Sequence, residues 1–444
     1  MTTNGQLLAQ QANRESNART YPRHLPIALD SASGMIVTDV SGEEYLDCLS
    51  GAGSMALGHN HPVVTEAIER ALGNDRPLHT LDLTTPIKER FVDTLFESLP
   101  TAFARHAKIQ FCSPAGTDAI EAALKLVKAA TGNEVVYGFQ GGYHGMTAGA
   151  LGLMGDESVR AGIPGLRSNG QQLPFPYSYR SPFGDDGDHT TASGYVERLL
   201  DDPNAGLDAP AGLLTEIVQG EGGVIPAPDQ WVREIRRITR EREIPLIVDE
   251  VQTGLGRTGA LYAFEHAGIT PDVVVLSKAI GGGLPLSAVV YHERLDSWAP
   301  GAHAGTFRGG QLAMAAGQAT IDYVMENDLA SHADRMGARL LDHLARISTA
   351  YPTIGDCRGR GLMLGVEIVD PDVETDGPRP AAPELAASIQ QGCLERGLIV
   401  ERGGRHSATV RFLPPLIVTA DQIDEVAEIF ESAVEAAAFG GASP

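Results

Sequence analysis

Apolar and polar positions alternate along the middle of the chain in a pattern typical of a mostly parallel β-sheet covered by helices. Between about residue 105 and residue 290, short apolar runs of strand length are separated by stretches with helical spacing. This alternation predicts an α/β fold class. The predicted strands are residues 108–112, 134–137, 212–218, 244–248, 271–277 and 286–291.

The two ends of the chain carry shorter patterns. Residues 34–40 and 44–49 alternate like a hairpin, after about 25 polar residues that we expect to form a partly mobile arm. Toward the C-terminus, helical patterns at 327–348 and 383–396 flank a strand-like run at 361–368. These patterns predict a smaller α/β domain.

The remaining segments suggest where the parts of the molecule meet. Residues 181–189 are expected to form an exposed loop, and the Pro- and Asp-rich residues 371–383 a linker or flap. We therefore expect an N-terminal segment at 1–62 that forms an arm and part of the small domain, a large domain at 63–325, and a C-terminal small domain at 326–444.

Composition narrows the classes of function. The chain of 444 residues has a formal net charge of −23, so it lacks the basic surface that nucleic acid requires. Its four cysteines lie far apart without a CxxC pair, which argues against a zinc site or a disulfide framework. The first residues lack the regions of a signal peptide, and no apolar run approaches ~18 residues. We expect a soluble, cytoplasmic enzyme without a nucleic-acid or membrane partner.

Two of the apolar runs end in opposite charges. Asp249 ends one run, and Lys278 follows another and precedes Ala-Ile-Gly-Gly-Gly. A lysine amine in such a place can form a Schiff base with pyridoxal phosphate, while an aspartate carboxylate keeps the cofactor's pyridine nitrogen protonated. Burial and a neighbouring cation would lower the pKa of the amine and make it a nucleophile near neutral pH. Taken alone, the pattern also fits ordinary strand-end residues that reach solvent.

Two glycine-containing segments suggest contacts to the same cofactor. A helix is predicted to begin near Gly116 and Thr117, where exposed amide groups and the helix dipole suit a phosphate. The turn 138–145 holds Tyr143 and His144 among glycines, so an aromatic face there could stack on a flat ring. A plain helix cap and a plain turn are the alternatives.

The segment Gly254-Leu-Gly-Arg-Thr-Gly259 matches the GxGxxG spacing of dinucleotide-binding loops. Five residues separate it from the preceding strand, and it opens no second βαβ unit with an acid about 20 residues further on. A dinucleotide site is therefore not expected.

As a set, these motifs resemble the class III pyridoxal-phosphate-dependent aminotransferases, from about residue 20 to residue 435. The resemblance implies PLP fold type I, the aspartate aminotransferase-like fold, with a large sheet domain and a small α/β domain from both termini. It also implies a homodimer with shared active sites. The matching motifs are Glu216-Ile-Val-Gln-Gly-Glu-Gly-Gly223, Val248-Asp-Glu-Val-Gln-Thr-Gly-Leu-Gly-Arg-Thr-Gly259, Pro271-Asp-Val-Val-Val-Leu-Ser-Lys-Ala-Ile-Gly-Gly-Gly283 and Gly305-Thr-Phe-Arg-Gly309.

The resemblance assigns expected roles by position. Lys278 would bind the cofactor covalently and move the proton, and Asp249 would hold the pyridine nitrogen. Arg411 would grip the α-carboxylate of glutamate or 2-oxoglutarate, and Glu221 would pair with Arg411 when the other amine donor is bound. The other cofactor contacts would be Gly116 and Thr117 to the phosphate, Tyr143 on the ring face, Gln252 to the ring hydroxyl and Thr306 to the phosphate of the neighbouring subunit.

Further stretches, including residues 47–62 and 141–147, are similar to the diaminobutyrate–2-oxoglutarate transaminases of this class. They imply a ping-pong exchange of a terminal amine between L-2,4-diaminobutanoate and 2-oxoglutarate. Ectoine-pathway relatives stand close to this group. ω-Aminotransferases acting on ornithine, acetylornithine, 4-aminobutyrate or a polyamine remain alternatives, as do an aminomutase and a non-catalytic binding protein of the same fold. Gly310 departs from the asparagine more usual after Thr-Phe-Arg-Gly.

Overall fold

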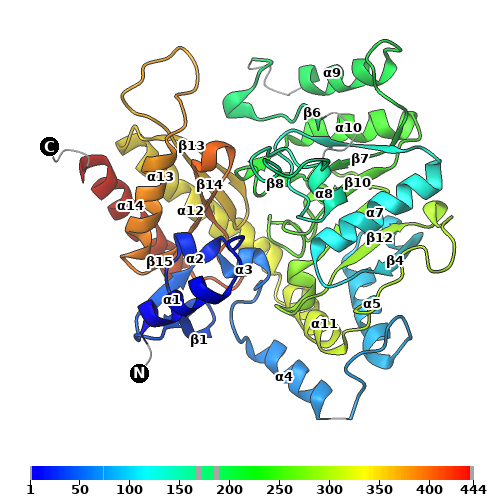
Figure 1. Cartoon of the computed structure of the whole chain (residues 1–444), viewed down its shortest axis with the longest axis horizontal. Coiled ribbons are helices and arrows are strands. Elements are labelled where there is room, and N and C mark those ends of the chain that lie inside the picture. Colours follow the sequence, from blue (N-terminus) through cyan, green and yellow to red (C-terminus); the bar gives the residue numbers. More distant parts are fainter. Residues whose placement is uncertain (1–2, 74, 167–171, 185–189, 441–444) are drawn as a thin grey trace.

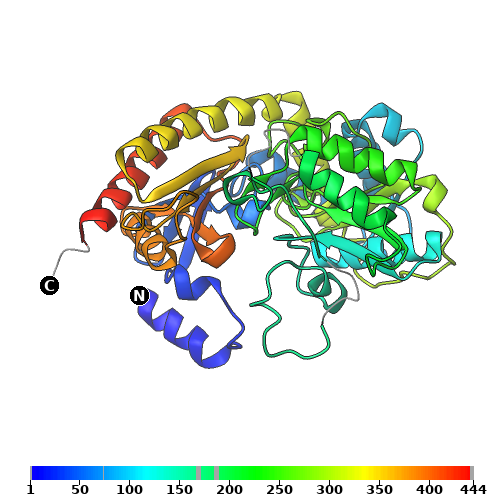
Figure 2. The same cartoon turned by 90° about the horizontal axis from the view of Figure 1, so that it is seen from above.

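The computed structural model describes residues 3–73, 75–166, 172–184 and 190–440. The ribbon forms two lobes side by side, which we call the large lobe and the terminal lobe (Figures 1 and 2). All strands of the large lobe's main sheet come from residues 107–292, whereas the sheets of the terminal lobe use residues 29–47 and 354–412. Both ends of the described chain lie on the terminal lobe.

The main sheet of the large lobe has seven strands in the order β4-β12-β11-β10-β7-β5-β6. Every neighbouring pair is parallel except those made by β12, which runs antiparallel to β11 and β4. The predicted α/β class with a mostly parallel sheet is confirmed. The strands are β4 (Ala107–Phe111), β5 (Val135–Phe139), β6 (Gln172–Leu173), β7 (Pro210–Thr215), β10 (Leu246–Asp249), β11 (Val273–Leu276) and β12 (Ala288–His292).

One predicted strand is divided in the structure. The apolar run at 212–218 was expected to be continuous, but β7 ends at Thr215 and β8 (Val218–Gln219) pairs with β9 (Ile225–Pro226) in a separate hairpin. The interruption falls at Glu216, whose carboxylate accepts backbone N–H bonds from Tyr143 and Gly220. The chain turns there because those bonds hold it, a long-range feature that hydrophobicity does not encode.

The central strands are continuous apolar runs because both of their faces are covered. All four residues of β11 are buried. Val273 and Val275 lie in the apolar cluster that includes residues of α7 (Gly116–Thr131), while Val274 lies in the main core on the other side. Helix α7 packs over β7, β11 and β12. Because neither face of these strands meets solvent, no alternate polar residues are needed. The strands therefore appear in the sequence as unbroken hydrophobic segments.

The terminal lobe joins the two ends of the chain. β15 (Leu398–Ile399) pairs in parallel with β3 (Glu44–Asp47), which completes a sheet with β2 (Ile36–Asp39) and β1 (Leu29–Ser33). The predicted hairpin is thus confirmed as β2 and β3. A second antiparallel sheet contains β13 (Ile354–Arg360), β14 (Met363–Ile368), β17 (Thr409–Phe412) and β16 (Glu401–Gly403).

The helices follow the predicted periodicity in most places. The two long C-terminal patterns become α12 and α13, and no helix or strand lies between Val369 and Ala382, where a linker was predicted. Of the predicted loop 181–189, the structure describes only 181–184, which contain no helix or strand. The helices not yet bounded are α3 (Ser50–Gly53), α4 (Pro62–Leu72), α5 (Pro86–Ser98), α6 (Thr101–Ala104), α8 (Ala148–Gly152), η1 (Ser178–Arg180), α9 (Thr190–Asp201), α10 (Asp229–Glu241), η2 (Ala263–Glu265), η3 (Lys278–Gly281), η4 (Glu293–Leu295), α11 (Gln311–Glu326), α12 (Leu329–Ala350), α13 (Pro383–Leu394), η5 (Arg405–Ser407) and α14 (Ala420–Gly440).

The polar N-terminal arm contains two helices, α1 (Asn4–Arg14) and α2 (Tyr21–His24). Thr3 caps α1 in a capping box with Gln6. Asn4 fixes the start of the helix to the terminal lobe, since its side chain accepts from the Ala28 amide at 2.8 Å. α1 buries no side chain, so hydrophobic periodicity gives no sign of it. No helix in the described ranges is both long enough and apolar enough to cross a membrane.

Neighbouring acids at the end of β10 point to different surroundings. Asp249 lines a cavity, whereas Glu250 is buried and accepts hydrogen bonds from the Phe264 amide, at 3.0 Å, and from the Thr253 hydroxyl. Burial raises the pKa of Glu250 to about 7. Glu250 therefore keeps its proton in the folded chain at a pH where the unfolded chain would lose it.

This difference predicts a pH-dependent stability. Because the pKa of Glu250 is raised in the folded chain, its protonated form contributes to the free energy of unfolding. This contribution is fully present below the ordinary pKa of 4.5 and is lost as the pH rises through about 7. Glu250→Gln preserves the shape and needs no ionisation, so its melting temperature should exceed that of the parent at pH 8 and nearly equal it at pH 5. At high pH the variant should gain at most about 3 kcal/mol of unfolding free energy over the parent. Calorimetry at both pH values checks this, with Glu428→Gln on the exposed side of α14 as the control; a constant difference would refute it.

Candidate active site

A cavity of about 280 Å³ lies at the edge of the sheet where β10 and β11 end. The parallel register places Asp249 opposite Val275, so the two strands finish at the same level and Lys278 follows just beyond. Ligand sites of open α/β sheets commonly lie at this edge of the strands. The cavity is lined by Ala115, Gly116, Thr117, Tyr143, His144, Gly145, Met146, Glu216, Glu221, Asp249, Val251, Gln252, Thr253 and Lys278.

Lys278 begins the short helix η3 directly after β11. Its backbone adopts a left-handed conformation with φ of 50°, which is uncommon for a residue with a side chain. Within the described part of the chain, its amine makes no hydrogen bond and no ion pair. Burial lowers the pKa of the Lys278 amine, Glu221 and Asp249 act to raise it, and Arg411 lowers it further. The amine is thereby prepared to react as a nucleophile.

Asp249 is held by His144, which comes from the turn after β5. His144 Nδ1 lies 2.8 Å from Asp249 Oδ2, and the Val251 amide donates to Asp249 Oδ1 at 3.0 Å. Burial alone would lower the pKa of His144, but the hydrogen bond and charge of Asp249 raise it above its ordinary value. His144 Nε2 is buried without a partner in the described structure. The pair gives the cavity one buried, oriented carboxylate.

The N-terminus of α7 forms another wall. Its first turn leaves backbone amides without intrahelical acceptors, and Gly116 sits so close to Val251 that an added Cβ would lie 2.9 Å from a Val251 methyl. The Thr117 hydroxyl lies 2.7 Å from that of Thr147. A Cβ on Gly145 would lie 2.3 Å from Thr117 Cβ, so the turn can approach the helix only because Gly145 lacks a side chain.

Gln252 connects the cavity to the N-terminal segment. Its Nε2 donates to the Ala52 carbonyl at 3.1 Å, in a loop where Ser50 to Gly53 all have positive φ. Its Oε1 is buried and has no hydrogen-bond partner among the described residues. The side chain is therefore fixed at one end and presents an acceptor at the other.

The opposite side of the site carries a buried ion cluster. Arg411 of β17 is fully buried and forms a bidentate pair with Glu221, with N–O distances of 2.9 and 2.8 Å. Glu401 of β16 lies 2.9 Å from the same guanidinium. Burial would raise the pKa of Glu221, yet the charge and hydrogen bonds of Arg411 lower it. For Glu401 burial prevails, and its pKa is raised.

The structure brings most of the sequence-predicted residues together. Gly116, Thr117, Tyr143, Glu221, Asp249, Gln252 and Lys278 all line the cavity, and Arg411 lies behind Glu221. Thr306 is exposed and does not line the cavity of its own chain.

Sequence reasoning missed the contact from His144 to Asp249 and the part played by Glu216, Val251 and Glu401. The residues of these contacts are far apart along the chain, and no fixed spacing links them. Only the register between β16 and β17, which pairs Glu401 with Arg411, reveals the second acid.

The glycine-rich segment 254–259 has a structural role in the fold. It forms turns followed by the short η2, without the helix of a dinucleotide-binding unit. Arg257 is buried and donates to the carbonyls of Leu362 and Pro414. Since both carbonyls belong to the C-terminal part of the chain, this motif connects the two lobes.

The family model for aminotransferase class-III matches residues 17–434. The chain belongs to the class III aminotransferases.

Two curated relatives of this chain share one name, diaminobutyrate–2-oxoglutarate aminotransferase. It is 55% identical over 432 residues to the diaminobutyrate–2-oxoglutarate aminotransferase of Rhizobium meliloti strain 1021, covering 96% of this chain and 92% of the relative. It is 44% identical to the enzyme of that name from Haemophilus influenzae Rd, covering 98% and 96%.

Solved structures place the chain in the transaminase fold, as predicted. The PLP-bound amine transaminase of an uncultivated Pseudomonas species superposes with a TM-score of 0.83 at 28% identity, covering 96% of this chain and 97% of that one. The ornithine aminotransferase of Toxoplasma gondii ME49 also gives 0.83, at 25% identity and with coverage of 98% and 96%.

The ion cluster predicts unequal effects of removing its members. Arg411→Met would leave Glu221 and Glu401 facing each other without a cation, whereas Glu221→Gln leaves Arg411 with Glu401 as its partner. We expect Arg411→Met to cost about 3–5 kcal/mol of unfolding free energy and Glu221→Gln less than half of that. Urea denaturation of the apoprotein measures both. Arg346→Met, which breaks an exposed pair with Glu431, is the control and should change stability little, because solvent screens that pair; an equal loss for all three variants would contradict the expectation.

Proposed function

We propose that the protein is a pyridoxal-phosphate-dependent aminotransferase that exchanges a terminal amino group between L-2,4-diaminobutanoate and 2-oxoglutarate. The products are aspartate 4-semialdehyde and glutamate, and the two half-reactions alternate in a ping-pong cycle. The observation that carries the proposal is that Lys278, Asp249 and Glu221 line one cavity, with Arg411 paired to Glu221 behind its wall. The names of relatives 55% and 44% identical support the choice of substrates.

The residues of the cavity fit pyridoxal phosphate. Lys278 has no other bond to its amine among the described residues, and Asp249 offers a carboxylate oriented by His144. The amides at the start of α7 suit the phosphate, and Gln252 Oε1 is an unused acceptor for the ring hydroxyl. Tyr143 and Val251 supply aromatic and apolar walls for a flat ring. When bound, this cofactor supplies an electron sink for the negative charge that develops on the substrate carbon.

The cavity residues Lys278, Asp249 and His144 have separate tasks in the proposed reaction. Lys278 Nζ would hold the cofactor and, as a free amine, would move the proton at the amine-bearing carbon of the substrate. Asp249 would hold the cofactor's ring nitrogen through a hydrogen bond to its carboxylate. His144 in turn keeps the Asp249 carboxylate oriented. The hydrogen bond and charge of Asp249 in turn raise the pKa of His144 above its ordinary value.

The Glu221–Arg411 pair explains how one cavity can accept two substrates. With the terminal-amine donor bound, Glu221 neutralises Arg411. With 2-oxoglutarate or glutamate bound, the α-carboxylate takes the place of Glu221 on the guanidinium, whose planar fork matches either carboxylate. Glu221 can leave because its side chain is 31% exposed, whereas that of Arg411 is fully buried and stays.

We also propose that the working unit is a homodimer. Exposed apolar side chains gather in the segment that contains Leu78, Leu81 and Leu83, and His79 pairs through its backbone with Gly310. Phe307, 66% exposed, contacts the His79 ring and neighbours Thr306. Apolar surface of this kind marks an interaction site. A partner docked on it would receive Thr306 near its cofactor phosphate, and the exposed position of Thr306 in the single chain agrees with that role.

A different amino donor would be the nearest alternative, since ornithine aminotransferase shares the fold. The purified protein, supplied with pyridoxal phosphate and 2-oxoglutarate, should form glutamate from L-2,4-diaminobutanoate with a kcat/KM at least about tenfold above those for ornithine, acetylornithine and 4-aminobutanoate. Coupled measurement of glutamate for each donor checks this. A preference for another donor would sink the substrate assignment and leave the aminotransferase chemistry intact.

Two controls separate the chemistry from the choice of donor. Lys278→Ala should abolish glutamate formation with every donor, because no other lysine of the described residues lines the cavity. Borohydride reduction of the parent protein with its cofactor, followed by peptide mapping, should label Lys278 and leave the half-buried Lys88 and the exposed Lys108 unmodified. Label elsewhere would overturn the assignment of Lys278.

The substrate switch predicts a selective kinetic defect. Arg411→Lys keeps the charge but loses the planar fork of the guanidinium. With glutamate the variant should therefore lose about 2–4 kcal/mol of transition-state stabilisation, as measured by kcat/KM. The kcat/KM for the terminal-amine donor should change much less. Single-turnover absorbance with each substrate alone measures the two half-reactions separately. Equal impairment of both would reduce the Glu221–Arg411 contact to a structural ion pair.

A further inference from the structure

Glu401 is a second carboxylate on Arg411 that the proposed exchange of substrates does not use. Glu401 is the first residue of β16, and the antiparallel register sets it directly opposite Arg411 in β17. Its Oε2 lies 2.9 Å from Arg411 Nη2 but outside hydrogen-bonding geometry, and this oxygen has no hydrogen-bond partner in the described part of the chain. It is a buried acceptor without a donor, which is a costly arrangement unless a ligand supplies one.

Two carboxylates share the Arg411 guanidinium. Glu221 takes both terminal nitrogens in its bidentate pair, and Glu401 lies against one of them. Arg411 Nε, also fully buried, has no partner among the described residues. The other cation that acts on both acids is Lys278, whose amine the cofactor would occupy, so Arg411 alone would then face the two carboxylates. A site with an unneutralised carboxylate favours a ligand that brings a second cation.

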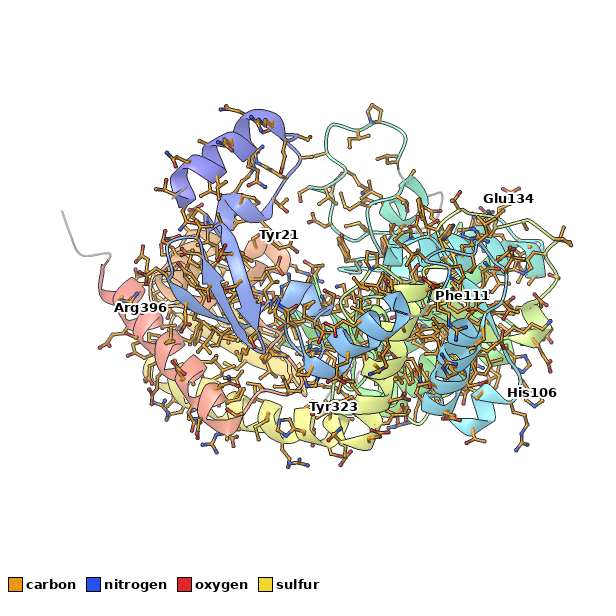
Figure 3. All side chains as sticks on the ribbon, turned by 90° about the horizontal axis from the view of Figure 1, so that it is seen from below. Tyr21, His106, Phe111, Glu134, Tyr323 and Arg396 are labelled. Atoms are coloured by element: carbon orange, nitrogen blue, oxygen red, sulfur yellow. The ribbon has the colours of Figure 1, made fainter. Side chains whose placement is uncertain are left out.

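Tyr21 lies beside this acid. It belongs to α2 in the N-terminal segment, which meets the blue strands of the terminal lobe (Figure 3). Burial raises the pKa of Tyr21 and so do the charges of Glu401 and Glu221, while interaction with Tyr21 acts to lower the pKa of Glu401. The phenol is neutral, so it supports the Glu401 carboxylate through a hydrogen bond but brings no positive charge.

We infer that Glu401 binds the second ammonium group of the amino donor and thereby selects a diamino acid over an ω-amino acid that has a single amine. The inference rests on the proposed function and adds to it the residue that determines donor specificity. Glu221 is unsuited to this task, because both of its oxygens are committed to Arg411 in the donor half-reaction. Glu401 touches the same guanidinium through one oxygen only and stays in place when Glu221 leaves.

The experiment compares donors that differ by one group. L-2,4-Diaminobutanoate and 4-aminobutanoate have the same carbon chain, terminal amine and carboxylate, and only the first carries an α-ammonium. With the holoenzyme, Glu401→Gln should lower kcat/KM for diaminobutanoate by about 10- to 100-fold, the effect of one hydrogen bond to a charged group, mainly through KM. The value for 4-aminobutanoate should stay within about threefold or rise, since a repulsive carboxylate is gone.

Further measurements separate the possible outcomes. The reverse donor glutamate tests Arg411, and its kcat/KM should not fall in Glu401→Gln, because its α-carboxylate would meet a guanidinium with one competing carboxylate fewer. Glu401→Asp keeps the charge and should recover part of the preference, while Glu44→Gln on the exposed start of β3 serves as the matched control. Equal losses for all three donors, or no loss for diaminobutanoate, would overturn the inference. If the parent protein itself fails to use diaminobutanoate, the proposed function is wrong regardless of Glu401.

Discussion

The parallel pairing of β10 with β11 is the constraint on which the site depends. Both strands are buried on both faces, so their register cannot slip without carrying apolar side chains out of the core. With Asp249 opposite Val275, the two strands end at the same level of the sheet. Lys278 follows the end of β11 after one extended residue, Ser277. A carboxylate and an amine are thereby held at fixed places in a cavity that the surrounding helices and turns close.

Burial of charge then determines how the rest of the cavity is built. Asp249 is tolerable in its position because His144 and the Val251 amide meet its oxygens. Glu216 satisfies the amides of two turns, and its pKa is raised to about 7 by burial. Arg411 is fully buried and needs carboxylates around it. The same requirement for compensation explains the ordered backbone of the turns and the two carboxylates that meet Arg411.

The site is also a junction between the lobes. Glu221 comes from the large lobe and Arg411 from the terminal lobe, and their pair closes one wall of the cavity. Nearby, Arg358 donates to the carbonyls of Gly223 and Val224, and the Gly404 amide donates to the Glu221 carbonyl at 2.8 Å. A substrate that displaces the Glu221 carboxylate therefore acts on a contact that joins the two lobes, while the backbone bonds beside it keep them in register.

The sequence by itself determined the α/β class and most of the strands and helices, because strand-length apolar runs and glycine-rich turns are local signals. Two strand ends suggested Lys278 and Asp249 as candidates, and their expected roles, like those of the other site residues, came from a family resemblance that the comparisons confirmed at the level of the family. Only the tertiary structure revealed that His144 orients Asp249, that β15 closes a sheet with β3, and that Glu401 shares Arg411 with Glu221. These features rest on strand register and side-chain burial between segments up to several hundred residues apart. Local patterns carry no information about such contacts, so the balance of charge in the cavity, and with it the inferred recognition of the donor, could be judged only from the folded chain.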